Sequence, residues 1–95
     1  MLVVSIMFTV KLLYAKDMNQ TTDYVPDKET AIKVAEAVWL PIFGDKIYDY
    51  KPFVAKLVNN KIWIVEGTLH EAKGGVPHIE IQKKDCKILK VYHEK

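Results

Sequence analysis

The sequence contains no arginine, and all fourteen of its basic side chains are lysines. Lysine lacks the planar, five-donor group with which arginine binds phosphates and base edges bidentately. The formal net charge is only +2, and residues 81–95 form the basic end, with five lysines against two acids. The composition therefore argues against nucleic acid as a partner.

Cysteine occurs once, as Cys86, which excludes an internal disulfide and leaves no set of thiols to build a zinc site. The 95 residues suffice for one small domain, near the lower size at which a single apolar core is enough without metals or disulfides. The sequence shows no internal repeat. Burial of apolar side chains must therefore supply the stability.

No motif in the sequence specifies a reaction. We expect His70, His78 and His93 to be surface histidines, with the last two pointing to opposite faces of a hairpin, so no metal site is expected. Tyr48-Asp49-Tyr50 and Glu66 would act as acid and base only in a pocket that shifts a carboxylate pKa. So small a domain is not expected to enclose one. We therefore predict no enzyme activity, no catalytic residue and no cofactor.

Residues 1–15 are mostly apolar and end in the small residue Ala15, and residues 16–23 are polar. This pattern favours a signal peptide cleaved after Ala15 and followed by a linker, and it is too short for a stable membrane anchor. The protein would then be periplasmic or secreted. Lys11 interrupts the apolar block, so the alternative is an N-terminal strand or helix that packs on the domain of a cytoplasmic protein.

An amphipathic helix of about four turns is predicted after Asp27, which can cap its first turn, while Val25 can pack onto Ala31. Pro41 is expected to kink or end the helix, and a short second helix is expected over residues 46–50. The apolar positions recur at helical spacing: Ala31, Ile32, Ala35, Val38, Trp39 and Ile42.

Residues 53–58 and 61–69 read as two strands joined by Asn59-Asn60, a pair that suits a two-residue turn. In that register Lys56 lies opposite Trp63, so Trp63 lies on a face that mixes apolar and polar side chains. On this face Trp63 is either a core residue or an exposed aromatic anchor. The other face is wholly apolar and comprises Phe53, Ala55, Leu57, Ile62 and Ile64.

Residues 78–82 and 88–93 are predicted to form a second hairpin, because apolar and polar residues alternate in the first of these segments. A three-residue loop, residues 84–86, places Cys86 in the left-handed conformation that normally falls to glycine. This loop predicts four cross-strand pairs: His78 with Tyr92, Ile79 with Val91, Glu80 with Lys90, and Ile81 with Leu89. The sequence thus predicts an α+β fold, an N-terminal helix packed on a four-stranded antiparallel sheet.

Several segments, in this order and spacing, carry a resemblance to a known family. They are residues 26–37 (PDKETAIKVAEA), 41–44 (PIFG), 51–53 (KPF), 63–67 (WIVEG), 74–76 (GGV) and 79–84 (IEIQKK). From about residue 24 to residue 95 the chain resembles the nuclear-transport-factor-2-like (NTF2) fold immunity proteins of bacterial polymorphic toxin systems. Cys86 is a departure, because this family often has glycine there.

The resemblance implies a protein encoded beside a toxin, which binds that toxin and blocks it without catalysis. The expected partner is the cognate protein toxin, and the expected state is a monomer or small homo-oligomer. The contact is expected on the mixed face of the sheet or on the loop of residues 70–75. Six residues are the candidates for partner binding: Trp63, Glu66, His78, Glu80, Lys90 and Tyr92.

A helix followed by antiparallel strands also describes cystatin-like and PepSY-type domains, which inhibit or accompany proteases. Val65-Glu66-Gly67 is similar to the Val-x-Gly of the cystatin hairpin, although Trp63 stands where that motif has glutamine. A protease-inhibiting or protease-associated module is therefore the alternative function.

Overall fold

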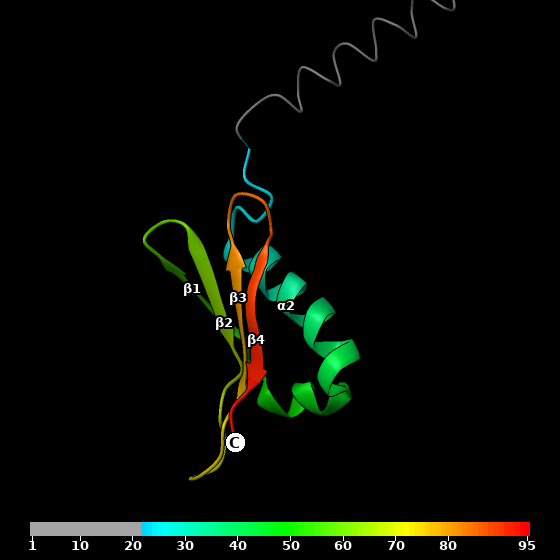
Figure 1. Ribbon diagram of the computed structural model, residues 1–95. Helices are drawn as coiled ribbons and strands as arrows, with labels where there is room; N and C mark the ends of the chain where they lie inside the picture. Colours follow the sequence, from blue (N-terminus) through cyan, green and yellow to red (C-terminus); the bar gives the residue numbers. More distant parts are fainter. Residues whose placement is uncertain (1–21) are drawn as a thin grey trace, which may run out of the picture.

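A computed structural model describes residues 22–95 (Figure 1). Its elements are the helix α2 (Lys28–Phe43), the 3-10 helix η1 (Asp45–Tyr50) and the strands β1 (Val54–Val58), β2 (Ile62–Glu66), β3 (Pro77–Gln82) and β4 (Ile88–His93). The strands form one antiparallel sheet in the order β1-β2-β3-β4, and α2 packs on one of its faces. The predicted α+β fold is therefore confirmed.

The predicted signal peptide and all but the last two residues of the predicted linker lie outside the described residues. Within residues 22–95, no helix has the length and apolar character needed to cross a membrane. Asp23 forms a salt bridge to the second hairpin, because its carboxylate lies 2.9 Å from the Lys83 ammonium.

Helix α2 begins where the sequence predicts. Asp27 accepts hydrogen bonds from the backbone N–H and the hydroxyl of Thr30, at 2.8 and 2.6 Å. Val25 is fully buried and donates its N–H to the Lys83 carbonyl at 3.0 Å. The N-terminal cap and the second hairpin thus hold each other in place.

Helix α2 runs through Pro41, so it does not end there, and it ends two residues later at Phe43. Pro41 lies in the last turn, where it lacks the N–H that would donate to the Ala37 carbonyl, and only Ile42 and Phe43 follow it in the helix. Gly44 ends the helix with a φ of 80° and donates its N–H to the Leu40 carbonyl at 2.9 Å. Ile42, predicted for the buried face, is 58% exposed. The second short helix is confirmed as η1.

The first hairpin differs from the predicted register by one residue. Asn59 and Asn60 both have positive φ, and the Lys61 N–H donates to the Val58 carbonyl, as a two-residue turn requires. Lys61 is then an extra residue, and pairing resumes with Ile62 opposite Val58. A shift of one residue turns every side chain of a strand to the other face. The predicted facings of Ile62, Trp63, Ile64 and Val65 are therefore wrong.

The core explains the observed register. Turned inward, Trp63 and Val65 lie opposite Ile81 and Ile79 of β3, and all four side chains are buried beneath α2. Trp63 donates its indole N–H to the Val25 carbonyl at 2.8 Å, so its one polar atom is satisfied inside. Burying this large ring and Val65 fills a core that Ile62 and Ile64 would fill less completely. The core also contains Val25, Ala31, Ala35, Trp39, Ile47, Phe53 and Ala55.

The second hairpin confirms the predicted pairing of His78, Ile79 and Glu80 with Tyr92, Val91 and Lys90. Its loop has four residues rather than three, because the Gln82 N–H donates to the Lys87 carbonyl and the Cys86 N–H to the Gln82 carbonyl. A β-bulge at Leu89 absorbs the difference, so Ile81 lies opposite Ile88 instead of Leu89. Cys86 has the predicted left-handed conformation, with a φ of 63°.

Candidate functional site

The sheet has one covered face and one open face, because α2 packs on a single side (Figure 1). We call the uncovered side the open face, and its side chains alternate along each strand with those of the core. It comprises Val54, Lys56, Val58, Ile62, Ile64, Glu66, His78, Glu80, Gln82, Lys90 and Tyr92. All of these are exposed or half-buried except His78.

The structure brings five of the six predicted partner-binding residues together on the open face. Glu66, His78 and Tyr92 form one row across β2, β3 and β4, and Glu80 with Lys90 lies in the next row. The sixth residue, Trp63, is on the covered face and only 4% exposed. The interpretation of Trp63 as an exposed anchor is wrong, and its alternative as a core residue is confirmed.

His78 is the centre of this group and is only 6% exposed, so the prediction of a surface histidine is wrong. Its Nδ1 lies 2.9 Å from Oε2 of Glu66, and its Nε2 lies 2.8 Å from Oε2 of Glu80. The Tyr92 ring stacks on the imidazole, with centroids 4.4 Å apart and planes 17° from parallel. Because carboxylates only accept hydrogen bonds, both ring nitrogens can donate only when the imidazole is protonated.

The electrostatics agree with a protonated ring. Burial lowers the pKa of His78, but the hydrogen bonds and charges of Glu66 and Glu80 together outweigh it, and the pKa is raised above its ordinary value. When protonated, the imidazolium bridges β2 and β3 through its bonds to Glu66 and Glu80. The pKa of Tyr92 is also raised, first by burial and then by the nearby carboxylates of Glu94, Glu80 and Glu66. Three carboxylates thus surround this ring pair, although the chain as a whole is positively charged.

The backbone of His78 is fixed from the opposite side of the sheet. Trp39, which is fully buried under the sheet, donates its indole N–H to the His78 carbonyl at 3.3 Å. The imidazole is held by carboxylates on the open face and the main chain by the core. His78 is therefore oriented before any partner or ligand arrives.

Glu94, just beyond β4, belongs to this group and was missed by the sequence reasoning. Its N–H donates to the Val76 carbonyl at 3.1 Å, and ligand atoms of Glu66, His78 and Glu94 all lie within 4.8 Å of one another. A side chain at Gly75 would collide with the Glu94 backbone, so this close approach requires glycine. The glycine pair before β3 is the sequence signal that points to such an approach.

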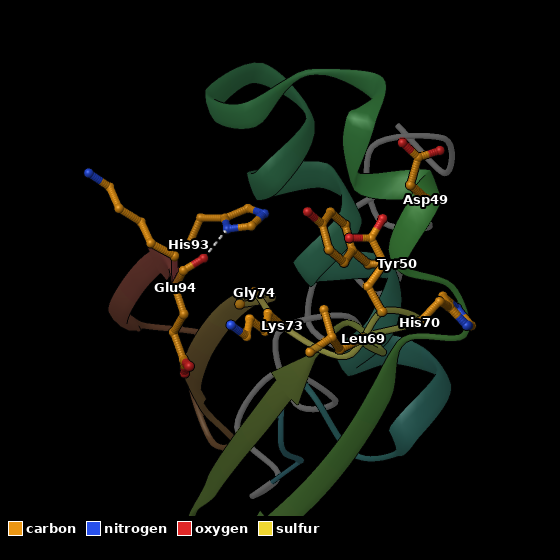
Figure 2. Close-up of a pocket in the computed structure, with 11 residues that line it drawn as sticks. Asp49, Tyr50, Leu69, His70, Lys73, Gly74, His93 and Glu94 are labelled. Carbon is orange, nitrogen blue, oxygen red and sulfur yellow. Dashed lines mark hydrogen bonds between the residues drawn. The ribbon is translucent and has the colours of Figure 1, made fainter.

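A cavity of about 410 Å³ lies where η1, the loop after β2 and the segment after β4 meet (Figure 2). Its lining includes the loop of residues 70–75, the other predicted contact region. The His93 ring points toward Tyr50, with centroids 5.1 Å apart, whereas the Glu94 carboxylate points away from it. His78 and His93 lie on opposite faces of the sheet, as predicted.

The possible acid and base residues do not converge. The Tyr48 hydroxyl donates to Glu36 of α2 at 2.6 Å, which raises the pKa of Tyr48. Tyr50 packs against Gly67 and His93, and Asp49 is exposed. Glu66 instead bonds to His78 on the open face. These four residues therefore form no acid–base pair with one another.

The segment that is similar to the cystatin motif does not project from the domain. Val65 is fully buried in β2, and Gly67 packs against Tyr50 and Pro77 while its N–H donates to the Pro77 carbonyl at 3.1 Å. An inhibitory hairpin tip would have to be exposed to enter a protease cleft. This segment is part of the sheet instead.

Residues 30–95 match the family described as NTF2 fold immunity protein. The match covers nearly all of α2, η1 and the four strands, including the open face and the cluster around His78. No curated protein and no solved structure shows a significant match to the chain. Since the family match spans more than half of the sequence, the chain belongs to the NTF2 fold immunity protein family.

Proposed function

We propose that this immunity protein neutralises a cognate bacterial toxin by binding it directly, through the open face of the sheet. Membership of the family supports the immunity role. The observation that carries the choice of surface is the mixed chemistry of the open face. Val54 is 55% and Tyr92 41% exposed, and both lie beside a fixed group of charged residues.

The open face has the composition of a protein interface. Apolar side chains of β1 and β2 lie at one side, and the aromatic ring of Tyr92 lies among carboxylates at the other. Interfaces combine an apolar centre with a polar rim, and aromatic residues often dominate their binding energy. The sheet also holds these side chains on a rigid scaffold, which reduces the entropy lost on binding. Blocking a toxin by occupation of its surface requires no catalytic residue.

The test is co-expression of the full chain with the toxin domain encoded by the neighbouring gene, followed by measurement of growth and of binding by the purified proteins. The wild-type chain should restore growth. Val54→Lys and Tyr92→Ala should each weaken binding by about tenfold or more, because each alters an exposed contact on the open face.

Ile42→Lys is the matched control, because Ile42 is an apolar residue of similar exposure, 58%, on α2 instead of the open face. It should leave binding unchanged. Neutralisation that survives both open-face variants would refute the choice of surface. A loss on Lys73→Glu alone would move the contact to the loop of residues 70–75.

We also propose that residues 1–15 direct export and are then removed. The composition of this segment, an apolar block ending in Ala15 before a polar run, supports the proposal. Mass spectrometry of the protein from the periplasmic or secreted fraction should find Lys16 as its first residue. A chain that begins at Met1 and stays in the cytoplasm would contradict it.

A further inference from the structure

We propose that Glu66, His78 and Glu94 bind one divalent transition-metal ion, with zinc as the best match. The three residues come from β2, β3 and the segment after β4, and their ligand atoms lie within 4.8 Å of one another. One imidazole nitrogen with two carboxylate oxygens is a donor set that suits zinc and leaves a fourth tetrahedral position open. Nothing in the immunity family's description assigns this site.

The two carboxylate contacts of His78 are satisfied together only when both ring nitrogens carry a hydrogen or a metal ion replaces one of those hydrogens. Nδ1 of His78 lies 2.9 Å from Oε2 of Glu66, and two lone pairs at that distance repel each other. In the metal-free protein a proton on Nδ1 fills this position. A zinc ion replaces that proton and, unlike a proton, also draws in the carboxylate of Glu94 as a third ligand.

Glu80 has the position of an outer partner for the metal-bound histidine. Histidine ligands usually donate their second ring N–H to a carboxylate or carbonyl, which fixes the tautomer and the ring orientation. Nε2 of His78 lies 2.8 Å from Oε2 of Glu80, and the Tyr92 ring covers the imidazole. The Trp39 indole also holds the His78 carbonyl. The main ligand is thus already oriented in the absence of metal.

The third ligand depends on a glycine. The backbone of Glu94 approaches Gly75 so closely that a Cβ at residue 75 would collide with it, and the Glu94 N–H donates to the Val76 carbonyl. This approach brings the Glu94 side chain beside β3, within reach of His78. Because Glu94 itself is exposed, its carboxylate can move the remaining distance to a bound ion.

The experiment is isothermal titration of the full chain, freed of metal by a chelator, with zinc chloride alone at neutral pH. We expect about one equivalent of zinc to bind. Glu94→Gln, which removes a charged ligand, should weaken binding at least tenfold, and Glu80→Gln, which removes the outer partner, by roughly 10- to 100-fold. Nitrogen NMR of the imidazole should place the metal-induced shift on Nδ1 of His78.

His70→Gln and Cys86→Ser are the controls, because both residues can bind zinc but lie outside the cluster. Both should leave zinc affinity unchanged. Absence of saturable binding, or an affinity that Glu94→Gln leaves unchanged, would overturn the proposal. An equal loss in either control would do so as well. Within residues 22–95 the exposed Glu94 carboxylate forms no hydrogen bond or ion pair, so Glu94→Gln should remain folded, and thermal unfolding of each variant verifies this. The result is independent of toxin binding, since no toxin is present.

Discussion

The burial of Trp63 leads to a prediction that separates the observed register of the first hairpin from the one expected from the sequence. In the structure Trp63 is 4% exposed and donates its indole N–H to the Val25 carbonyl. In the expected register it would lie on the open face and would be available to a partner. Trp63→Phe keeps an aromatic ring but removes the donor and part of the volume.

The expected cost of Trp63→Phe has two parts. The Val25 carbonyl, on a fully buried residue, loses its indole partner, and an unsatisfied buried polar group costs about 1–3 kcal/mol. The smaller ring leaves a partly filled space, which adds roughly 1 kcal/mol. A total of about 2–4 kcal/mol should lower the melting temperature by about 4–8 °C for each kcal/mol. Since a domain of this size has roughly 5–10 kcal/mol in all, the variant should remain folded at room temperature.

Urea unfolding of the wild type and variants measures this cost directly. Val54→Ala is the control, because Val54 is 55% exposed on the open face and its truncation should change the free energy of unfolding by less than about 0.5 kcal/mol. If Trp63→Phe cost no more than this control and yet weakened toxin binding, Trp63 would be exposed. The observed register would then be refuted.

Three further changes test other parts of the structure. Because the pKa of His78 is raised on folding, its stabilisation should be complete below the unfolded pKa of about 6.5 and lost as the pH rises through the folded pKa. The stability difference between wild type and His78→Gln, measured by urea unfolding with chelator present, should therefore shrink with rising pH, and a constant difference would contradict the imidazolium bridge. Cys86→Gly should relieve left-handed strain of about 1–2 kcal/mol and so raise the melting temperature, although loss of the contact between the half-buried thiol and the core offsets part of this gain. A lower melting temperature would refute the strain argument. Gly67→Ala should cost about 1–3 kcal/mol in urea unfolding, because the new Cβ would lie 2.6 Å from Cβ of Tyr50, and a neutral result would show that this contact yields easily.

Local features of the fold could be predicted because each depends on a few neighbouring residues. Asp27 caps α2 with its own side chain, and Asn59, Asn60 and Cys86 adopt positive φ at the places where the turns require it. The alternation around Ile79 correctly separated the two faces of β3. The same alternation brought His78, Glu80 and Tyr92 together on the open face.

The remaining features depend on contacts between distant segments. A two-residue and a three-residue connection both fit Asn59-Asn60-Lys61 locally, and only the packing of Trp63 under α2, with its bond to Val25, distinguishes them. His78 appears exposed in its own strand and becomes buried because Glu66 and Tyr92 flank it from neighbouring strands.

The corrected register also changes the chemistry of the proposed binding surface. With Trp63 turned inward, the open face loses one aromatic residue and gains Ile62 and Ile64, so its β1–β2 side becomes aliphatic. Tyr92 remains as the aromatic residue of this face, and it lies against His78 among three carboxylates. Exchange of the His78 proton for a divalent ion would raise the charge of this cluster by one unit without moving the aliphatic side. Toxin contacts with Tyr92 and Glu66 should then respond to zinc and salt, because they lie within a Debye length of about 8 Å of the exchanged charge. Contacts with Val58 and Ile62, at the far end of β1 and β2, should respond less.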